Sequence, residues 1–245
     1  MSDFSNLPVT VIGASRGLGR TIAETFYRQG AQVLATARGQ AHLDAMAREL
    51  PGLKVLAGDA SQPDAPRQAF AIQVPRLLIL CGGAIPPCRP LPDMDWEAFG
   101  ANWNSDVRMS FHFLQAALMR PLPDGTTVVT IGSGAMIGGS PVSGGYAGSK
   151  RMQVFMSGYA QKESDRAGLG LRFLSLSPAR IMPEADVGKA GIAGYAAYNG
   201  VTEAAFIEGL GTPLSLKTVA DALTGLVGDK ASGDFLVSQD GVSAL

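Results

Sequence analysis

The chain has 245 residues, a formal net charge of −1 and a hydrophobic content of 46%. Charged residues make up 17%, below the roughly 25% of typical globular domains, which indicates extensive buried surface. The nearly neutral charge gives no electrostatic reason to expect nucleic acid or an anionic membrane as a partner. The two cysteines, Cys81 and Cys88, have neither CxxC spacing nor enough companions for a disulfide framework or zinc site. We therefore expect no metal.

The N-terminal segment lacks the basic and apolar regions of a secretion signal. No uninterrupted apolar run reaches the roughly 18 residues that a membrane span requires. The sequence therefore predicts a cytoplasmic protein without a membrane segment.

Short apolar runs alternate with longer helical patterns from one end of the chain to the other. The predicted strands are residues 9–12, 32–35, 54–57, 77–80, 126–131, 171–176 and 235–237. The predicted helices are residues 18–29, 40–50, 95–119, 146–166 and 215–227. This alternation predicts an α/β, doubly wound fold with a parallel sheet of about seven strands and helices on both faces.

No repeat, low-complexity tract or linker divides the chain, so we expect one domain over residues 1–245. The regular alternation is interrupted at residues 182–211, which are rich in glycine and alanine and follow the sixth predicted strand. Ligands of such sheets bind beyond the carboxyl ends of the strands. Residues 182–211 are therefore expected to form a substrate-binding lid.

A glycine-rich segment follows the first predicted strand, with glycines at 13, 17 and 19 in a GxxxGxG spacing. Glycines let backbone N–H groups approach a pyrophosphate closely, and the next helix directs its positive end at the anion. A plain tight turn is the alternative, since the chain has 31 glycines. The position between strand and helix favours dinucleotide binding, and the expected cofactor contacts here are Gly13, Ser15, Arg16, Gly17, Leu18 and Gly19.

The residues after the second predicted strand bear on cofactor choice. An NAD site usually has an acidic residue there for the ribose 2′-hydroxyl, whereas an arginine suits a 2′-phosphate. This chain has Arg38 and no acid at positions 36–38, and Arg16 adds a second guanidinium. NADP(H) is therefore favoured over NAD(H), with two solvated surface arginines as the alternative. Asp59, after the third strand, is either an adenine contact or a cap for the next helix.

A tyrosine and a lysine at i and i+4, Tyr146 and Lys150, lie on one face of a predicted helix. A free phenol has a pKa of ~10, too high for acid–base work near neutrality. A neighbouring ammonium, helped by an oxidised nicotinamide, is expected to lower that pKa. An isolated YxxxK pair is weak evidence, but Ser133 lies thirteen positions before Tyr146 and can hydrogen-bond a substrate oxygen.

These residues resemble the short-chain dehydrogenase/reductase family over nearly the whole chain. The resemblance includes the glycine turn, Asp59, the Ser133, Tyr146 and Lys150 set, Ser140-Pro141, Pro178 and Asp240-Gly241. It implies a Rossmann-type fold, a homodimer or homotetramer, and hydride transfer between nicotinamide and a carbonyl or alcohol carbon. Tyr146 is then the general acid or base, Lys150 holds the cofactor ribose and adjusts the tyrosine pKa, and Ser133 orients the substrate oxygen.

The chain departs from the family pattern at several places. The family's Asn-Asn-Ala-Gly run corresponds to Cys81-Gly82-Gly83-Ala84, where Gly82 is still expected to contact the cofactor. The family's catalytic Asn falls on Asp106, with Asn104 or Asn102 as the counterpart if the register slips.

A further departure follows the sixth predicted strand. The family's carboxamide-contacting Thr, five positions after Pro178, is Pro183 here. Main-chain contacts from Ile181 are expected to substitute for it.

The leading hypothesis is an NADP(H)-dependent oxidoreductase for a small, neutral carbonyl or alcohol substrate. An NADP(H)-binding regulatory or scaffolding protein is the alternative, against which the intact Ser133, Tyr146 and Lys150 argue. A nucleotide-sugar epimerase would need a larger C-terminal substrate domain. The lid residues Met182, Tyr195, Tyr198 and Phe206 suit an apolar pocket, or else they pack the lid itself or a subunit interface.

Overall fold

The computed structural model describes residues 4–119 and 122–245, and within these ranges eight strands form one sheet. The strands are β1 (Pro8–Ile12), β2 (Gln32–Ala37), β3 (Lys54–Ala57), β4 (Leu77–Leu80), β5 (Thr127–Ile131), β6 (Arg172–Pro178), β7 (Gly233–Ser238) and β8 (Gly241–Ala244). Their spatial order is β3-β2-β1-β4-β5-β6-β7-β8. The predicted doubly wound α/β fold is confirmed.

The eighth strand is the one that the sequence did not predict. β8 pairs antiparallel with β7, whereas the other neighbouring strands pair in parallel. All four residues of β8 are exposed, so the strand carries no apolar run that would mark it. It is held by hydrogen bonds of the β7–β8 hairpin at the sheet edge, not by burial.

The helices of the described residues include every predicted one and several more. They are α1 (Gly17–Arg28), α2 (Gln40–Glu49), α3 (Ala65–Ile72), α4 (Trp96–Asn102), α5 (Arg108–Met119), α6 (Ala135–Gly138), α7 (Gly145–Ala167), α8 (Asp186–Asn199), α9 (Glu203–Gly209) and α10 (Leu216–Gly228). A π-helical turn, Trp103–Val107, joins α4 to α5 within the helix predicted over residues 95–119. The unpredicted α3, α6 and α9 are short, and α8 lies within the predicted lid.

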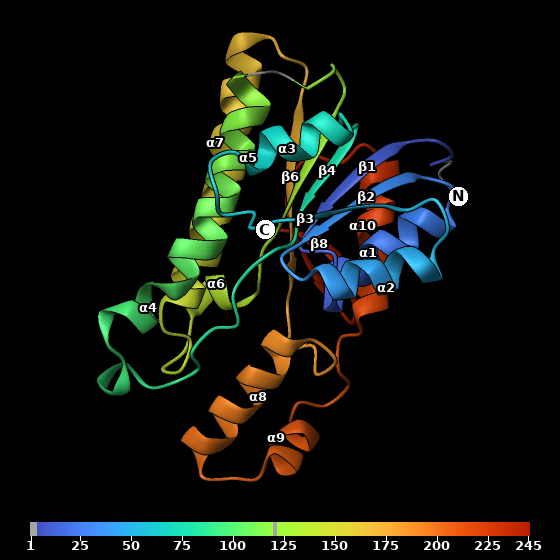
Figure 1. Cartoon of the computed structure of the whole chain (residues 1–245). Coiled ribbons are helices and arrows are strands. Elements are labelled where there is room, and N and C mark those ends of the chain that lie inside the picture. Colours follow the sequence, from blue (N-terminus) through green and yellow to red (C-terminus); the bar gives the residue numbers. More distant parts are fainter. Residues whose placement is uncertain (1–3, 120–121) are drawn as a thin grey trace.

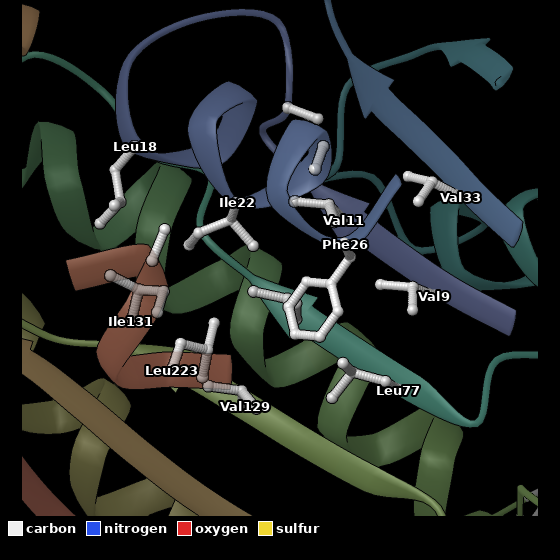
Figure 2. Close-up of a cluster of buried hydrophobic side chains, with 14 of the residues drawn as sticks. Val9, Val11, Leu18, Ile22, Phe26, Val33, Leu77, Val129, Ile131 and Leu223 are labelled. Carbon is white, nitrogen blue, oxygen red and sulfur yellow. The ribbon is translucent and has the colours of Figure 1, made fainter. Parts of the chain in front are cut away.

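The helices cover both faces of the sheet. Figure 1 shows α1, α2 and α10 on one side and α3, α5 and α7 on the other. The alternation of side chains along β1 serves both layers, because successive strand residues point to opposite faces. Val9 and Val11 pack with Ile22 and Phe26 of α1 (Figure 2), whereas Ile12 belongs to the cluster on the opposite face. Burial of each large side chain stabilises the fold by about 1.5–3 kcal/mol.

The strand order also locates a binding crevice. Chain order reverses between β1 and β4, and ligands of open α/β sheets bind beyond the carboxyl ends of the strands at such a point. Helices α8 and α9, the orange pair in Figure 1, stand beyond this edge. None of the helices in residues 4–119 and 122–245 is long and apolar enough to cross a membrane.

Candidate active site

A cavity of about 660 Å³ lies at the carboxyl edge of the sheet, between the glycine-rich turn, the start of α7 and the start of α8. Its lining includes every residue that the sequence put forward for catalysis or cofactor binding: Gly13, Ser15, Arg16, Gly17, Leu18, Gly19, Arg38, Asp59, Gly82, Asp106, Ser133, Tyr146, Lys150, Pro178 and Ile181. Residues that are dispersed along the sequence are thus gathered around one space.

The glycine-rich turn is packed too closely for side chains. Gly13 has φ +84°, and a Cβ on it would lie 2.5 Å from the Cα of Gly82. A Cβ on Gly19 would lie 2.1 Å from the carbonyl oxygen of Gly13. The first residues of α1 have no side-chain cap, so their N–H groups are available to an anion. This geometry fits the pyrophosphate of a dinucleotide.

The two arginines at the adenosine end have different surroundings. Arg38 is exposed after β2, next to the cavity. Arg16, before α1, forms a 3.0 Å ion pair with Asp186 at the start of α8. No acidic residue occupies positions 36–38, and the Arg16 guanidinium is already paired with Asp186.

Asp59 is held by its own turn. Its carboxylate accepts hydrogen bonds from the Ser61 N–H at 2.9 Å and the Ser61 hydroxyl at 2.8 Å. These bonds, chiefly the one from the Ser61 backbone, lower the pKa of Asp59. The residue at the N-cap of the next helix, α3, is Asp64. Asp59 therefore stabilises the turn after β3 instead of capping α3, while still lining the cavity.

The serine, tyrosine and lysine meet at the other end of the cavity. Ser133 follows β5, and Tyr146 and Lys150 lie in the first turns of α7. The Lys150 Nζ lies 5.7 Å from the centre of the Tyr146 ring. A phenol, an ammonium and a hydroxyl thus face one space, an arrangement suited to moving a proton to or from a substrate oxygen.

The pKa of Tyr146 is raised above that of a free phenol. Burial is the largest cause, and it outweighs the lowering by the Lys150 ammonium and by a hydrogen bond with Ser133. Asp106 contributes a further increase. The lowering by Lys150 that the sequence predicted is present, but burial, of which the sequence pattern gives no measure, outweighs it. The phenol holds its proton at neutral pH, as a proton donor must.

Asp106 forms a buried ion pair with Lys150. The Asp106 Oδ2 lies 3.2 Å from the Lys150 Nζ, and the two side chains are only 1% and 9% exposed. Burial disfavours the Lys150 ammonium, but the charge of Asp106 and the Tyr146 oxygen outweigh it, so the pKa of Lys150 is raised. Lys150 is therefore charged throughout the physiological range.

The other carboxylate oxygen of Asp106 is fixed by neighbouring donors. It accepts hydrogen bonds from the Ala84 N–H at 2.9 Å, the Ser105 hydroxyl at 2.6 Å and the Asn102 amide at 3.4 Å. Asn104 is exposed, and Asn102 donates mainly to the Ala84 carbonyl at 3.0 Å. Among the three residues that the sequence left open, Asp106 is the one that contacts Lys150.

Two residues that support Asp106 were not singled out from the sequence. Gln153 of α7 donates a hydrogen bond of 3.1 Å to the Asp106 carbonyl, which lies in the π-helical turn. Gly83 leaves the space that the carboxylate occupies, since a Cβ there would lie 2.6 Å from Oδ2. Gly83 takes the place of the family's Ala, so the two departures from the family pattern meet at one point in space.

Further residues around the cavity include Pro178, Cys81 and Cys88. Pro178, the last residue of β6, accepts a 2.7 Å hydrogen bond from the Gly134 N–H. Cys81 lies next to Lys150, yet burial raises the pKa of its thiol to about 12, so it is not a thiolate nucleophile. Cys88 also lines the cavity and packs against Gly194 of α8. Of the four lid residues that the sequence offered for an apolar pocket, Met182 and Tyr195 line the cavity, whereas Tyr198 and Phe206 are not among its lining residues. Ser143, which the sequence analysis did not propose, lines it as well.

A family model described as short chain dehydrogenase matches residues 8–186, well over half of the chain. The chain therefore belongs to the short-chain dehydrogenase family, a class of oxidoreductases with this fold. A solved short-chain dehydrogenase from Brucella melitensis, described as a glucose/ribitol dehydrogenase, superposes with a TM-score of 0.78 and covers 96% of each chain at 21% identity. That similarity concerns the fold.

Curated relatives match over shorter segments. L-xylulose reductase of Homo sapiens is 31% identical over 100 residues, 41% of each chain. Carbonyl reductase [NADPH] 2 of Sus scrofa is 28% identical over 113 residues, 46% of each chain. D-erythrulose reductase of Gallus gallus is 28% identical over 122 residues, half of each chain. The chain thus aligns with at most half the length of these relatives.

Proposed function

We propose that this protein is an NADP(H)-dependent oxidoreductase that interconverts a small, neutral carbonyl compound and its alcohol. The observation that carries the proposal is the meeting of Ser133, Tyr146 and Lys150 in the cavity that also contains the glycine-rich turn. The names of the curated relatives, which include ketose and carbonyl reductases, support the same reaction class. A purely regulatory NADP(H)-binding protein would have no use for an assembled proton donor.

The cavity residues divide the work of carbonyl reduction. NADPH supplies the hydride when bound, and the glycine-rich turn with Arg16 and Arg38 would hold its phosphates. Ser133 donates a hydrogen bond that orients the substrate carbonyl oxygen. Tyr146, protonated because burial raises its pKa, gives its proton to that oxygen. The Lys150 ammonium stabilises the resulting phenolate, and Asp106 holds Lys150 in place.

Cofactor choice is the first test of this proposal. Titration of the purified protein should show NADPH binding at least about tenfold more tightly than NADH, since a hydrogen bond to a charged group contributes roughly 1.5–3 kcal/mol. Arg38→Asp should move the preference toward NADH, because a carboxylate repels the 2′-phosphate and accepts from a ribose hydroxyl.

The matched control is Arg48→Asp, which makes the same charge change at an exposed position of α2 outside the cavity lining. It should leave the ratio of NADPH to NADH affinity unchanged. Equal affinities for the two cofactors in the unaltered protein would contradict the assignment of Arg16 and Arg38.

We also propose that the protein is one domain over residues 1–245, that residues 182–211 act as its lid, and that it works in the cytoplasm as a homo-oligomer. An exposed aromatic surface on the neighbouring helices α5 and α7 supports self-association. Phe111 is 47% exposed, and Phe155 and Tyr159, which stack on each other, are 43% and 55% exposed. Exposed apolar patches of this kind commonly mark protein interfaces.

Sedimentation should therefore give a dimer or tetramer, and Phe155→Glu should shift it toward monomer by placing a charge in the interface. The control Ile72→Glu changes another exposed apolar side chain, on α3, and should leave the assembly intact. A wild-type protein that is monomeric at micromolar concentration would contradict this part of the proposal.

A further inference from the structure

Three hydroxyl groups form a hydrogen-bonded chain at the lid side of the cavity. The Ser140 Oγ lies 2.9 Å from the Ser143 Oγ and 2.6 Å from the Tyr195 hydroxyl. Ser143 and Tyr195 line the cavity, and Ser140, which is not among the lining residues, is hydrogen-bonded to both. The chain thus connects the loop before α7 with helix α8, two segments far apart in the sequence.

The chain is held in a fixed position relative to the proposed proton donor. The Ser143 N–H donates to the Ser140 carbonyl at 3.0 Å, and the Tyr146 N–H donates to the Ser143 carbonyl at 3.1 Å. The Tyr195 ring stacks on Phe206 of α9 with centroids 5.5 Å apart and an interplanar angle of 2°. A group bound at these hydroxyls is therefore placed at a defined distance from Tyr146.

Several of the charged residues that line the cavity are paired with each other. Those that line it are Arg16, Arg38, Asp59, Asp106, Lys150, Arg180 and Asp186. Asp106 and Lys150 neutralise each other, as do Arg16 and Asp186. Arg180 is exposed and donates to the Leu210 carbonyl at 3.3 Å. The remaining charged residues, Arg38 and Asp59, follow β2 and β3, where we propose that the adenosine of the cofactor binds. Arg180 is thus a cavity cation with no acidic partner among the described residues, and it donates to the backbone just after α9, whereas Ser143 and Tyr195 are uncharged.

Hydrogen-bond arithmetic indicates what the chain can recognise. Each hydroxyl carries one proton and can also accept. Three protons and two internal hydrogen bonds leave one proton over. When the bonds run toward Tyr195, that proton is offered by Tyr195 and Ser143 keeps its free lone pairs; when they run the other way, the two ends exchange roles. A third arrangement, in which both ends donate to Ser140, leaves two acceptors in the cavity. In two of the three arrangements the cavity therefore presents one donor and one acceptor, which together match a neutral hydroxyl group.

We propose, resting on the function proposed above, that Tyr195, Ser140 and Ser143 form a subsite for a substrate hydroxyl near the reacting carbon. The preferred substrates are then hydroxy ketones or hydroxy aldehydes. Tyr195 and Ser143 are the specificity-determining residues, and Ser140 is a positioning residue that links them. Sites built to hydrogen-bond a hydroxyl discriminate against analogues that lack it, because their polar groups are then left unpaired.

The test compares hydroxyacetone with butanone, which differ by a hydroxyl in place of a methyl group. Because the hydroxyl also changes the intrinsic reactivity of the ketone, the readout is the ratio of the two kcat/KM values with NADPH, compared between wild type and variants. Tyr195→Phe, which keeps the ring that stacks on Phe206, and Ser143→Ala should each lower this ratio about fivefold to tenfold, the effect of one neutral hydrogen bond.

The matched control is Tyr198→Phe, the same change on the same helix at a residue that is 52% exposed and outside the cavity lining. Its ratio should equal that of wild type. Ratios unchanged in both Tyr195→Phe and Ser143→Ala, even with lower rates for both ketones, would show that the chain only anchors α8 and would overturn the subsite. If one variant does not fold, the other decides, because they lie on separate elements. No turnover of any carbonyl compound by wild type would instead overturn the proposed function, and the subsite with it.

Discussion

Tyr146→Phe is expected to lower kcat by about 10²–10⁴-fold while leaving NADPH binding nearly intact, since general acid catalysis contributes roughly that much. The substitution removes the hydroxyl and keeps the ring beside Lys150. Steady-state reduction of a good ketone substrate, together with a fluorescence titration of NADPH, measures the two quantities separately.

Tyr198→Phe provides the control for this experiment. It makes the same change on α8 at a side chain that is 52% exposed and outside the cavity lining, and it should keep normal turnover. Near-normal turnover of Tyr146→Phe would mean that another group delivers the proton. A loss of both turnover and cofactor binding would indicate that the ring, not the hydroxyl, is what the site needs.

Asp106→Asn is expected to destabilise the protein by about 3 kcal/mol, because breaking a buried ion pair leaves the other charge without a partner. Asp106 raises the pKa of Tyr146, so its neutralisation should lower that pKa. Alcohol oxidation requires the phenolate and increases with pH through the tyrosine pKa. Its pH profile should therefore move to lower pH, with maximal activity within about an order of magnitude of wild type.

Urea unfolding and pH profiles of alcohol oxidation provide the two measurements. The raised pKa of Lys150 means that the contribution of the ion pair is complete below about pH 10, the unfolded lysine value, and is lost as pH rises through the folded value. Unfolding at neutral pH therefore measures the whole effect. Asp221→Asn, which breaks the exposed pair with Lys217, is the control and should cost well under 1 kcal/mol.

The possible outcomes for Asp106→Asn separate three roles. A pH shift with retained activity identifies Asp106 as a positioning residue that acts through Lys150. A loss of activity as complete as that of Tyr146→Phe would mean that the carboxylate takes part in proton transfer. An unchanged pH profile would mean that Asp106 does not influence Tyr146.

Periodicity was sufficient to predict the elements that bury large apolar surfaces. The strand around Val9 and Val11 and the helix around Ile22 and Phe26 belong to the core, and their patterns locate them within a residue or two. Elements held by other forces were missed. β8 depends on edge hydrogen bonds, and α8 has several glycines and alanines where a helical pattern would show large side chains.

The candidate site was predictable where spacing carries the information, as in the glycine-rich turn and the pair Tyr146 and Lys150. The contacts across the cavity were not, because they join distant segments. The ion pair of Arg16 with Asp186 and the hydrogen bond of Tyr195 with Ser140 both depend on where α8 lies. The effect of Lys150 on the Tyr146 pKa was predictable, but the larger effect of burial was not, because only the folded structure defines it.

The absence of a side chain at Gly83 has a consequence for how related sequences can diverge. A Cβ at this position would lie 2.6 Å from the Asp106 Oδ2, so any other residue at 83 would require the carboxylate to shift from its present position beside Lys150. Residues 83 and 106 are 23 positions apart in the chain, yet a change at one alters the space available to the other. The structure therefore predicts that the two positions vary together in related sequences, with glycine at 83 where residue 106 is acidic.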